Sequence, residues 1–346
     1  MINVSNEELK ELSIYELRHL ARDTGVKSPT SKVKEELIKQ IIEIREGKRE
    51  PIVERSKKGR PPKVYNFNKQ KQKAITFCQD QSKYDLLGAS TMLGYVDIFD
   101  NIAYFCVEDR LSSKYVINEE LFSSFNLKIG DKILVEIDSD KNSIKDIYTI
   151  NGQPSGTLDS RCDYYDFQHI YVDKKISFSE NFGDLEANLG DNVFLFGANN
   201  INNTKMLINA LNNVENCKKI YINTTLTEKT KGLILDLKDS DKFLANITDE
   251  FDYAKSVVAL AINYAKRLFE MGENVLIAVD DILSISAIED TEMLYTKALL
   301  SLSKTAQNSA SISIFALMTR DEKLLWADKL ADRRFVIDGE DFMLLR

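Results

Sequence analysis

The sequence has few of the residues that build metal centres and disulfide scaffolds. Its 346 residues include two histidines, His19 and His169, and four cysteines, Cys78, Cys106, Cys162 and Cys217. The cysteines are far apart and form no CxxC pair, which excludes a disulfide-stapled fold and a zinc finger. We therefore expect no metal and no cofactor.

Long apolar runs are also missing. No stretch approaches the roughly 20 apolar residues of a membrane-spanning helix, and the N-terminus lacks the apolar core of a signal peptide. Hydrophobic residues make up 43% and charged residues 29% of the chain, which is typical of globular domains. The length fits two or three domains. We expect a cytoplasmic protein with no membrane contact.

The net charge of −8 is unevenly distributed. Residues 51–77 carry eight basic side chains against the single Glu54, whereas residues 78–346 carry 28 basic and 43 acidic side chains. A concentrated basic segment in an acidic protein is typical of a contact with a polyanion. A solvated charged linker is the plain alternative.

Residues 48–80 have the composition of a linker, and within them lies a short basic motif. Its candidate nucleic-acid-binding residues are Lys57, Lys58, Arg60 and Lys63, around Gly59-Arg60-Pro61. The motif resembles an AT-hook, in which an extended Arg-Pro segment lies in a narrow minor groove. Only one copy is present, so nonspecific nucleic-acid contact and a plain linker stay open.

Hydrophobic periodicity divides the rest of the chain into three parts. Residues 1–47 have helical spacing and predict a small helical domain. Residues 81–155 have a period of two and predict an OB-type (cold-shock-like) β-barrel. Its expected strands are Gly94–Phe99, Ala103–Val107, Lys114–Ile117, Lys132–Ile137 and Ile144–Ile150.

Residues 156–346 alternate apolar strands with helical patterns, which predicts an α/β domain with a largely parallel sheet. The expected strands are Asn192–Phe196, Lys219–Ile222, Asn274–Val279, Ser311–Leu317 and Arg334–Ile337. The expected helices are Thr204–Leu211, Tyr253–Glu270 and Thr291–Ala306.

This order of parts resembles the bacterial transcription termination factor Rho. Residues 17–22 (Leu-Arg-His-Leu-Ala-Arg) look like its N-terminal helical domain. In the barrel, 94–98, 114–116 and 125–131 are similar to the family's strands and turns. The segment 254–280 resembles the helix and Walker B strand of the motor. The resemblance implies a RecA-like ATPase domain at 156–346.

The phosphate-binding loop departs from the family pattern. Such a loop needs glycines, a lysine for the β- and γ-phosphates, and Ser/Thr for Mg²⁺. Residues 197–204 keep Gly197 and Thr204 but place Asn202 at the second glycine and Asn203 at the lysine. Lys205 is one residue out of register. We expect no tight ATP binding.

Other parts of the motor are also absent from the matching positions. The strand end near Thr224 has no acidic residue where the family activates water, and the segments matching the RNA-gripping loops are short. The sequence reaches Arg346 before the place of the arginine finger. Asp280 keeps the Walker B position, although it could also simply cap the next helix. We predict a degenerate RecA-like domain, a pseudo-ATPase rather than an enzyme.

The barrel offers three aromatic candidates for stacking nucleic-acid bases. Tyr115 matches an aromatic of the family's base-binding face, and Tyr104 and Phe105 lie near its aromatic strand. Stacking on exposed rings, with cations nearby, is how barrels of this type bind single strands. The surrounding segment is acidic, and buried core residues are the alternative for Tyr104 and Phe105.

Two functions follow from these patterns. The first is an inactive Rho-like regulator of transcription termination that antagonises or co-assembles with active Rho, as part of a homo- or hetero-oligomer, or that binds nucleic acid. The alternative is a nucleic-acid-binding architectural protein that acts independently of Rho through its basic linker. The expected partners are accordingly Rho or the transcription machinery, and RNA or DNA.

Overall fold

The computed structural model separates the chain into two compact units, 1–67 and 68–346. It describes residues 32–49, 91–108, 110–138, 141–157, 161–197, 200–289, 293–306, 310–319, 321–339 and 341–345, with Leu9, Leu17, Arg18, Leu20, Ala21 and 24–26. Helix α2 of the first unit spans Lys34–Arg45. It buries Leu37 and Ile41 in a small cluster with Leu9, Leu17 and Ala21.

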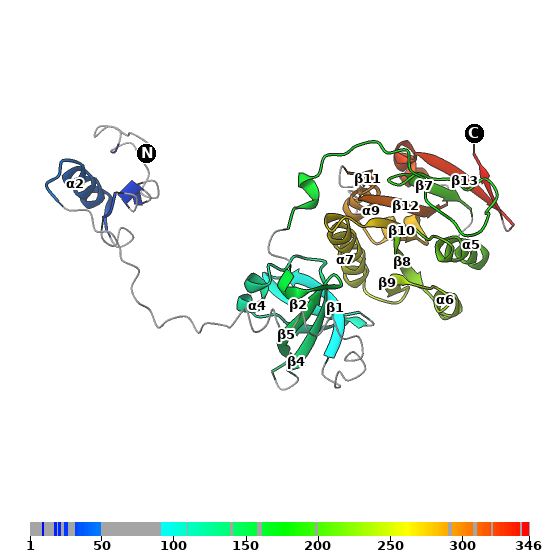
Figure 1. The fold of residues 1–346 in the computed structure, drawn as a ribbon, viewed down its shortest axis with the longest axis horizontal. Coiled ribbons are helices and arrows are strands. Elements are labelled where there is room, and N and C mark those ends of the chain that lie inside the picture. Colours follow the sequence, from blue (N-terminus) through cyan, green and yellow to red (C-terminus); the bar gives the residue numbers. More distant parts are fainter. Residues whose placement is uncertain are drawn as a thin grey trace. The chain divides into compact units, whose positions relative to one another are not determined.

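The first described part of the second unit is a closed barrel, drawn in cyan and green in Figure 1. Its strands are β1 (Thr91–Phe99), β2 (Ile102–Val107), β3 (Arg110–Val116), β4 (Lys132–Asp138), β5 (Ser143–Ile150) and β6 (Gln153–Pro154). They follow the order β3-β2-β1-β4-β5-β6, and a parallel contact between β3 and β5 closes the sheet on itself.

Side chains alternate between the two faces of each strand, and the inward-facing ones fill the barrel interior. Val96, Phe105 and Ile133 point inward from β1, β2 and β4, and all three are fully buried. Helix α4 (Glu119–Ser124) follows β3, starts at the capping side chain of Asn118 and adds Leu121 to the same core. The five predicted strands are present, whereas the sequence reasoning missed α4.

The rest of the unit is a mixed α/β domain built on a large sheet. Its strands are β7 (Asn192–Phe196), β8 (Lys218–Leu226), β9 (Ser240–Asn246), β10 (Asn274–Val279), β11 (Lys304–Thr305), β12 (Ser311–Met318), β13 (Arg333–Asp338) and β14 (Asp341–Leu344). The order is β14-β13-β7-β12-β10-β8-β9, with β11 beside β12. All pairings are parallel except those of β14 and β11.

Helices cover both faces of this sheet. They are α5 (Ile201–Asn212), α6 (Glu228–Ile234), α7 (Phe251–Glu270), α8 (Ile282–Ala287) and α9 (Leu294–Leu300). Short 3₁₀ turns lie in the connecting segments, at Ser155–Thr157, Tyr164–Asp166, Glu322–Leu324 and Ala327–Leu330. Successive residues of β10 alternate between two cores: Ile277 packs with α7, α8 and α9, and Ala278 with α5 and α6. The sheet is therefore the middle layer of three.

Helix α7 packs against both the barrel and the large sheet. Tyr95, Cys106 and Leu111 point outward from the barrel, and all three are buried in the same cluster as α7. The Tyr95 ring lies 4.9 Å from the ring of Phe243 on β9 and 5.1 Å from that of Tyr264 on α7. One side of the barrel's outer surface is thus part of the α/β core.

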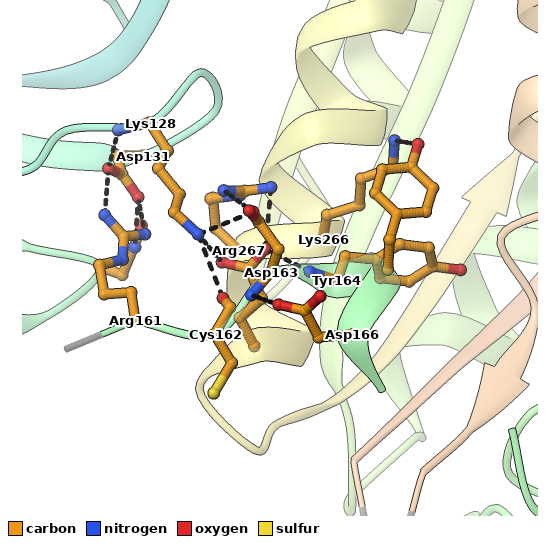
Figure 2. Close-up of polar contacts among 12 residues, drawn as sticks. Lys128, Asp131, Arg161, Cys162, Asp163, Tyr164, Asp166, Lys266 and Arg267 are labelled. Carbon is orange, nitrogen blue, oxygen red and sulfur yellow. Dashed lines mark hydrogen bonds and ion pairs between the residues drawn. The ribbon is translucent and has the colours of Figure 1, made fainter. Parts of the chain in front are cut away.

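Polar contacts complete this interface (Figure 2). Lys128 of the barrel donates to the Asp163 carboxylate at 2.8 Å and lies 3.5 Å from Glu270 of α7. Arg161 forms a two-point ion pair with Asp131, with both side chains almost fully buried. Because buried charges must be paired, the Arg161–Asp131 pair holds the segment after the barrel against it, and Lys128 connects the barrel to α7 through Glu270.

The predicted helix over 291–306 is wrong at its C-terminal end. Helix α9 ends at Leu300, and the hydroxyl of Ser301 bonds back to the carbonyl of Lys297 at 2.6 Å. Lys304 and Thr305 instead pair with Ile312 and Ser311 as the short strand β11. Tertiary pairing with β12 here overrides a helical pattern. Strands β9 and β14 and helices α6 and α8 were not foreseen.

Candidate functional site

Three parallel strands bring the predicted pocket residues to one edge of the large sheet. Gly197 follows β7, Asn223 and Thr224 lie near the end of β8, and Asp280 follows β10. The carboxyl ends of parallel strands are where α/β proteins bind ligands. The structure therefore gathers Gly197, Asn203, Thr204, Thr224 and Asp280 in one region.

Asp280 is the centre of a buried polar network. The hydroxyl of Thr204 donates to Asp280 Oδ1 at 2.8 Å, and the amide of Asn223 donates to Oδ2. Asp280 is only 5% exposed, and Thr204 and Asn223 are buried with it. Both carboxylate oxygens thus already accept a hydrogen bond from the protein.

Burial governs the protonation of this carboxylate. Loss of hydration raises the pKa of Asp280 above its ordinary value, although the bonds from Thr204, Tyr221 and Asn223 oppose that rise. The pKa of Tyr221, buried beside it, is raised for the same reason. An ionised carboxylate in such a place is stable only while its donors stay in position.

Asp280 does not cap the following helix, contrary to the simpler interpretation of its place in the sequence. The cap of α8 is Asp281, whose carboxylate accepts the N–H of Leu283 at 3.0 Å. Asp280 thus points back to α5 and β8, and Asp281 caps the N-terminus of α8. Thr224 is likewise buried and shares a 2.8 Å hydrogen bond with Ser284 of α8.

Backbone N–H groups at the start of α5 donate their hydrogen bonds to a side chain of the same loop. The side-chain oxygen of Asn200 accepts the N–H groups of Asn202 and Asn203, both at 3.0 Å. Asn203 is buried and its amide packs against Gly197, where an added Cβ would lie 2.3 Å from Nδ2. Asn202 and Lys205 are exposed. The polar groups of the loop thus contact one another.

A cavity of about 390 Å³ lies at the carboxyl ends of β7 and β12. Phe196 and Met318, at the ends of β7 and β12, form part of its lining together with Leu324 and Arg334. The Arg334 guanidinium donates to the carboxylate of Asp328 at 2.8 Å. Among the described lining residues, the cationic side chain of Arg334 is therefore already paired with an acid.

The three aromatic candidates lie on two different sides of the barrel sheet. Phe105 is fully buried and Tyr115 packs against the same interior core, with their ring centroids 6.4 Å apart. Tyr104 points to the outer face, since residue 105 points inward and neighbours in a strand alternate. Its ring lies 5.8 Å from Lys114 Nζ. Of the three candidates, only Tyr104 lies on the outer face.

Two residues that sequence reasoning passed over lie beside Tyr104. Phe99 is 61% exposed, and Lys114 Nζ lies 5.7 Å from its ring and 3.7 Å from Asp97. A cavity of about 200 Å³ next to them extends to Tyr253 and Val257 of α7. The period-two pattern could have found Phe99, because Asp97 and Phe99 share a face with Tyr104 across the β1–β2 pair.

The basic candidates Lys57, Lys58, Arg60 and Lys63 lie outside the described residues. Within the described part of the chain, no group of three or more His, Cys, Asp or Glu side chains is placed to hold a metal ion. None of the helices described there is long and apolar enough to cross a membrane.

Comparisons with known proteins give only structural neighbours. No protein-family model matches the sequence, and no curated protein matches it. An ATPase of the type III secretion system of pathogenic bacteria aligns with a TM-score of 0.42 and 12% identity over 50% of this chain and 60% of its own. The ATP synthase subunit NeqB of Nanoarcheaum equitans aligns with a TM-score of 0.39 and 12% identity over 48% and 51%. The alignments thus span less than two thirds of each neighbour.

Proposed function

We propose that this chain is a catalytically inactive Rho-like protein that regulates transcription termination by antagonising or co-assembling with active Rho. In this proposal the closed barrel is of the OB type and the large α/β domain is a degenerate RecA-like domain. The order of strands in the barrel, with β1 between β2 and β4 and β3 beside β5, supports an OB topology.

The observation that carries the proposal is the chemistry of the loop after β7. Phosphoryl transfer relies on cations that neutralise the charge of the phosphates. Asn203 stands at the lysine position and packs its neutral amide against Gly197. Asp280, at the position of a magnesium-binding carboxylate, bonds Thr204 and Asn223. These groups support a domain that keeps its architecture without hydrolysing ATP.

An inactive subunit suits regulation of a ring enzyme. Where an active site lies between neighbours and one neighbour supplies a residue in trans, a subunit without that machinery stops the sites on either side. The effect on activity would then exceed the fraction of inactive subunits in the ring. This nonlinearity is the signature to be measured.

The test uses purified full-length chain and active Rho from the same source. We expect the chain to co-elute with Rho in size-exclusion chromatography and to lower both RNA-dependent ATP hydrolysis and termination in vitro as the mixing ratio rises. An unrelated acidic protein at the same concentration serves as the control. Absence of a complex, with termination unchanged at excess chain, would sink the proposal.

The basic segment favours a second candidate, an architectural protein that binds nucleic acid independently of Rho. Its net charge of +7 over residues 51–77 would give salt-dependent binding. The variant with Lys57, Lys58, Arg60 and Lys63 replaced by Ala separates the two functions. It keeps its effect on Rho under the first proposal, and it loses oligonucleotide binding and all activity under the second.

A further inference from the structure

Another cavity, of about 430 Å³, lies at the amino ends of β7 and β13. Asn192, which begins β7, and Asp332, which directly precedes β13, both belong to its lining. Because these strands run parallel, the cavity is at the opposite edge of the large sheet from Gly197 and Asp280, which follow the carboxyl ends of their strands. This amino-end cavity is therefore separate from the candidate nucleotide site.

One side chain in the lining carries a buried oxygen that accepts no hydrogen bond. Asn192 is only 3% exposed, and its Nδ2 donates to the carbonyls of Leu300 and Leu330 at 2.9 and 3.1 Å. These two bonds fix the orientation of the amide. Within the described part of the chain, Asn192 Oδ1 is one of three buried side-chain polar atoms without a partner. Since burying an acceptor without a donor is unfavourable, this oxygen calls for a donor supplied by a ligand or by water.

The charges around this amide favour a ligand that is positively charged. The Asp332 carboxylate lies directly beside the amide, because it accepts the backbone N–H of Asn192 at 2.8 Å. Asp191 also lines the cavity, and it pairs with an arginine of β13 at 3.2 Å. The basic side chains of the described lining, His169 and Lys329, are both exposed. The groups next to the buried oxygen are thus acceptors, which suit a donor-rich cation.

Apolar and aromatic surface completes the lining. Leu189 and Leu300 are buried, whereas Tyr171 is 79% exposed. Methylene groups can pack on the leucines, and an ammonium group interacts favourably with the face of a tyrosine ring. We propose that the amino-end cavity binds a small organic amine, whose ammonium group donates to Asn192 Oδ1 and to the Asp332 carboxylate. A primary ammonium has three N–H donors for such contacts. The proposal does not depend on the regulatory function proposed above.

Calorimetric titration of the full-length chain with putrescine, a four-carbon diamine, tests this proposal at constant ionic strength. We expect saturable binding at one site per chain. Butanediol has the same carbon chain and donates hydrogen bonds without a positive charge, so it should bind at least about tenfold more weakly. Equal binding of the two compounds would overturn the assignment to an amine. Absence of saturable putrescine binding at millimolar concentration would mean that water alone serves Asn192 Oδ1, and would also overturn it.

Two pairs of variants locate the site. Asp332→Asn keeps an oxygen for the N–H of Asn192 but removes the charge, and it should weaken putrescine binding about tenfold. Asp338→Asn makes the same change of charge at the other end of β13 and should leave the affinity unchanged. Tyr171→Ala should weaken binding roughly two- to fivefold. Tyr165→Ala removes a ring that is 78% exposed and outside the described lining, and should have no effect.

The comparison within each pair distinguishes a built site from general attraction to an acidic protein. Equal losses for the two aspartate variants would indicate long-range attraction and would overturn the proposal, as would equal losses for the two tyrosine variants. Circular dichroism melting curves check that all four variants are folded. None of these results bears on inhibition of Rho, which the mixing experiment measures separately.

Discussion

Gly130 of the barrel lies directly against the backbone of Asn263 in α7. A Cβ at Gly130 would be 2.4 Å from the carbonyl carbon of Asn263, and the glycine has a φ of +86°. The close approach lets the loop before β4 reach the helix and places Lys128 and Asp131 beside their partners. The absence of a side chain at one position thus contributes to the interface between barrel and α7.

Replacing Gly130 by Ala should destabilise the second unit. Left-handed strain costs about 1–2 kcal/mol, and overlap with a helix backbone adds about 1–3 kcal/mol. Urea unfolding measures the sum. Gly152→Ala is the control, because Gly152 has a similar φ of +79° but nothing within 4 Å of its Cβ position. Equal losses in the two variants would contradict the close contact.

Arg161→Ala should be among the most destabilising substitutions at the interface. It leaves Asp131, whose side chain is fully buried, without its cation. Removing one partner of a buried pair costs about 3–5 kcal/mol. Lys175→Ala breaks an exposed pair with Glu186 and should leave the free energy of unfolding nearly unchanged. A small loss in the free energy of unfolding for Arg161→Ala would contradict the burial of Asp131 and show that its carboxylate is hydrated.

The network at Asp280 predicts a pH dependence of stability. Because burial raises the pKa of Asp280 above 3.8, the unfolded chain releases this proton at lower pH than the folded chain does. Ionisation of Asp280 therefore lowers the free energy of unfolding as pH rises from 3.8 to the raised pKa of the folded state. Asp280→Asn cannot titrate, so we expect the stability advantage of the wild type over this variant to shrink across that window.

Urea unfolding of both proteins from pH 4 to pH 7 measures this difference. Asp252→Asn, at an exposed carboxylate on the first turn of α7, controls for the loss of one negative charge. An advantage of the wild type that grows with pH would mean that the bonds from Thr204 and Asn223 dominate over burial.

The two faces of β2 predict opposite outcomes for neighbouring aromatic residues. On the hypothesis that the barrel binds single-stranded RNA, Tyr104→Ala, which removes an outward ring beside Lys114, should weaken that binding by roughly 5–150-fold, the equivalent of one stacked base. Phe105→Leu alters the barrel core and should lower stability while leaving RNA affinity unchanged. Fluorescence anisotropy at fixed salt measures both. An equal loss of affinity in the two variants would contradict this assignment.

Strong periodicity made much of the fold predictable from sequence. After the asparagine that opens each, the runs at 192–196 and 274–279 are continuously apolar because both faces of those strands are buried, and their bounds are as predicted. Strand β9 escaped notice because it lies at the sheet edge and mixes polar residues with the buried Phe243 and Ala245. Helix α4 has only six residues, too few for a helical period.

The candidate site was predictable in location but not in its internal bonding. Gly197, Thr204 and Asp280 follow from the order of strands and helices. The contribution of Asn223 does not, because its bond to Asp280 joins the ends of two strands that only the folded sheet brings together. The outward burial of Tyr95 is similarly hidden, since its pattern is that of any strand residue until α7 covers it.

The sharing of α7 has a consequence for synthesis on the ribosome. The last strand of the barrel ends at Pro154, whereas the helix that covers Tyr95, Cys106 and Leu111 ends at Glu270. Because translation delivers the N-terminal parts first, a newly made barrel carries a bare apolar side until the helix emerges. During that interval the exposed apolar side makes the nascent chain prone to aggregation.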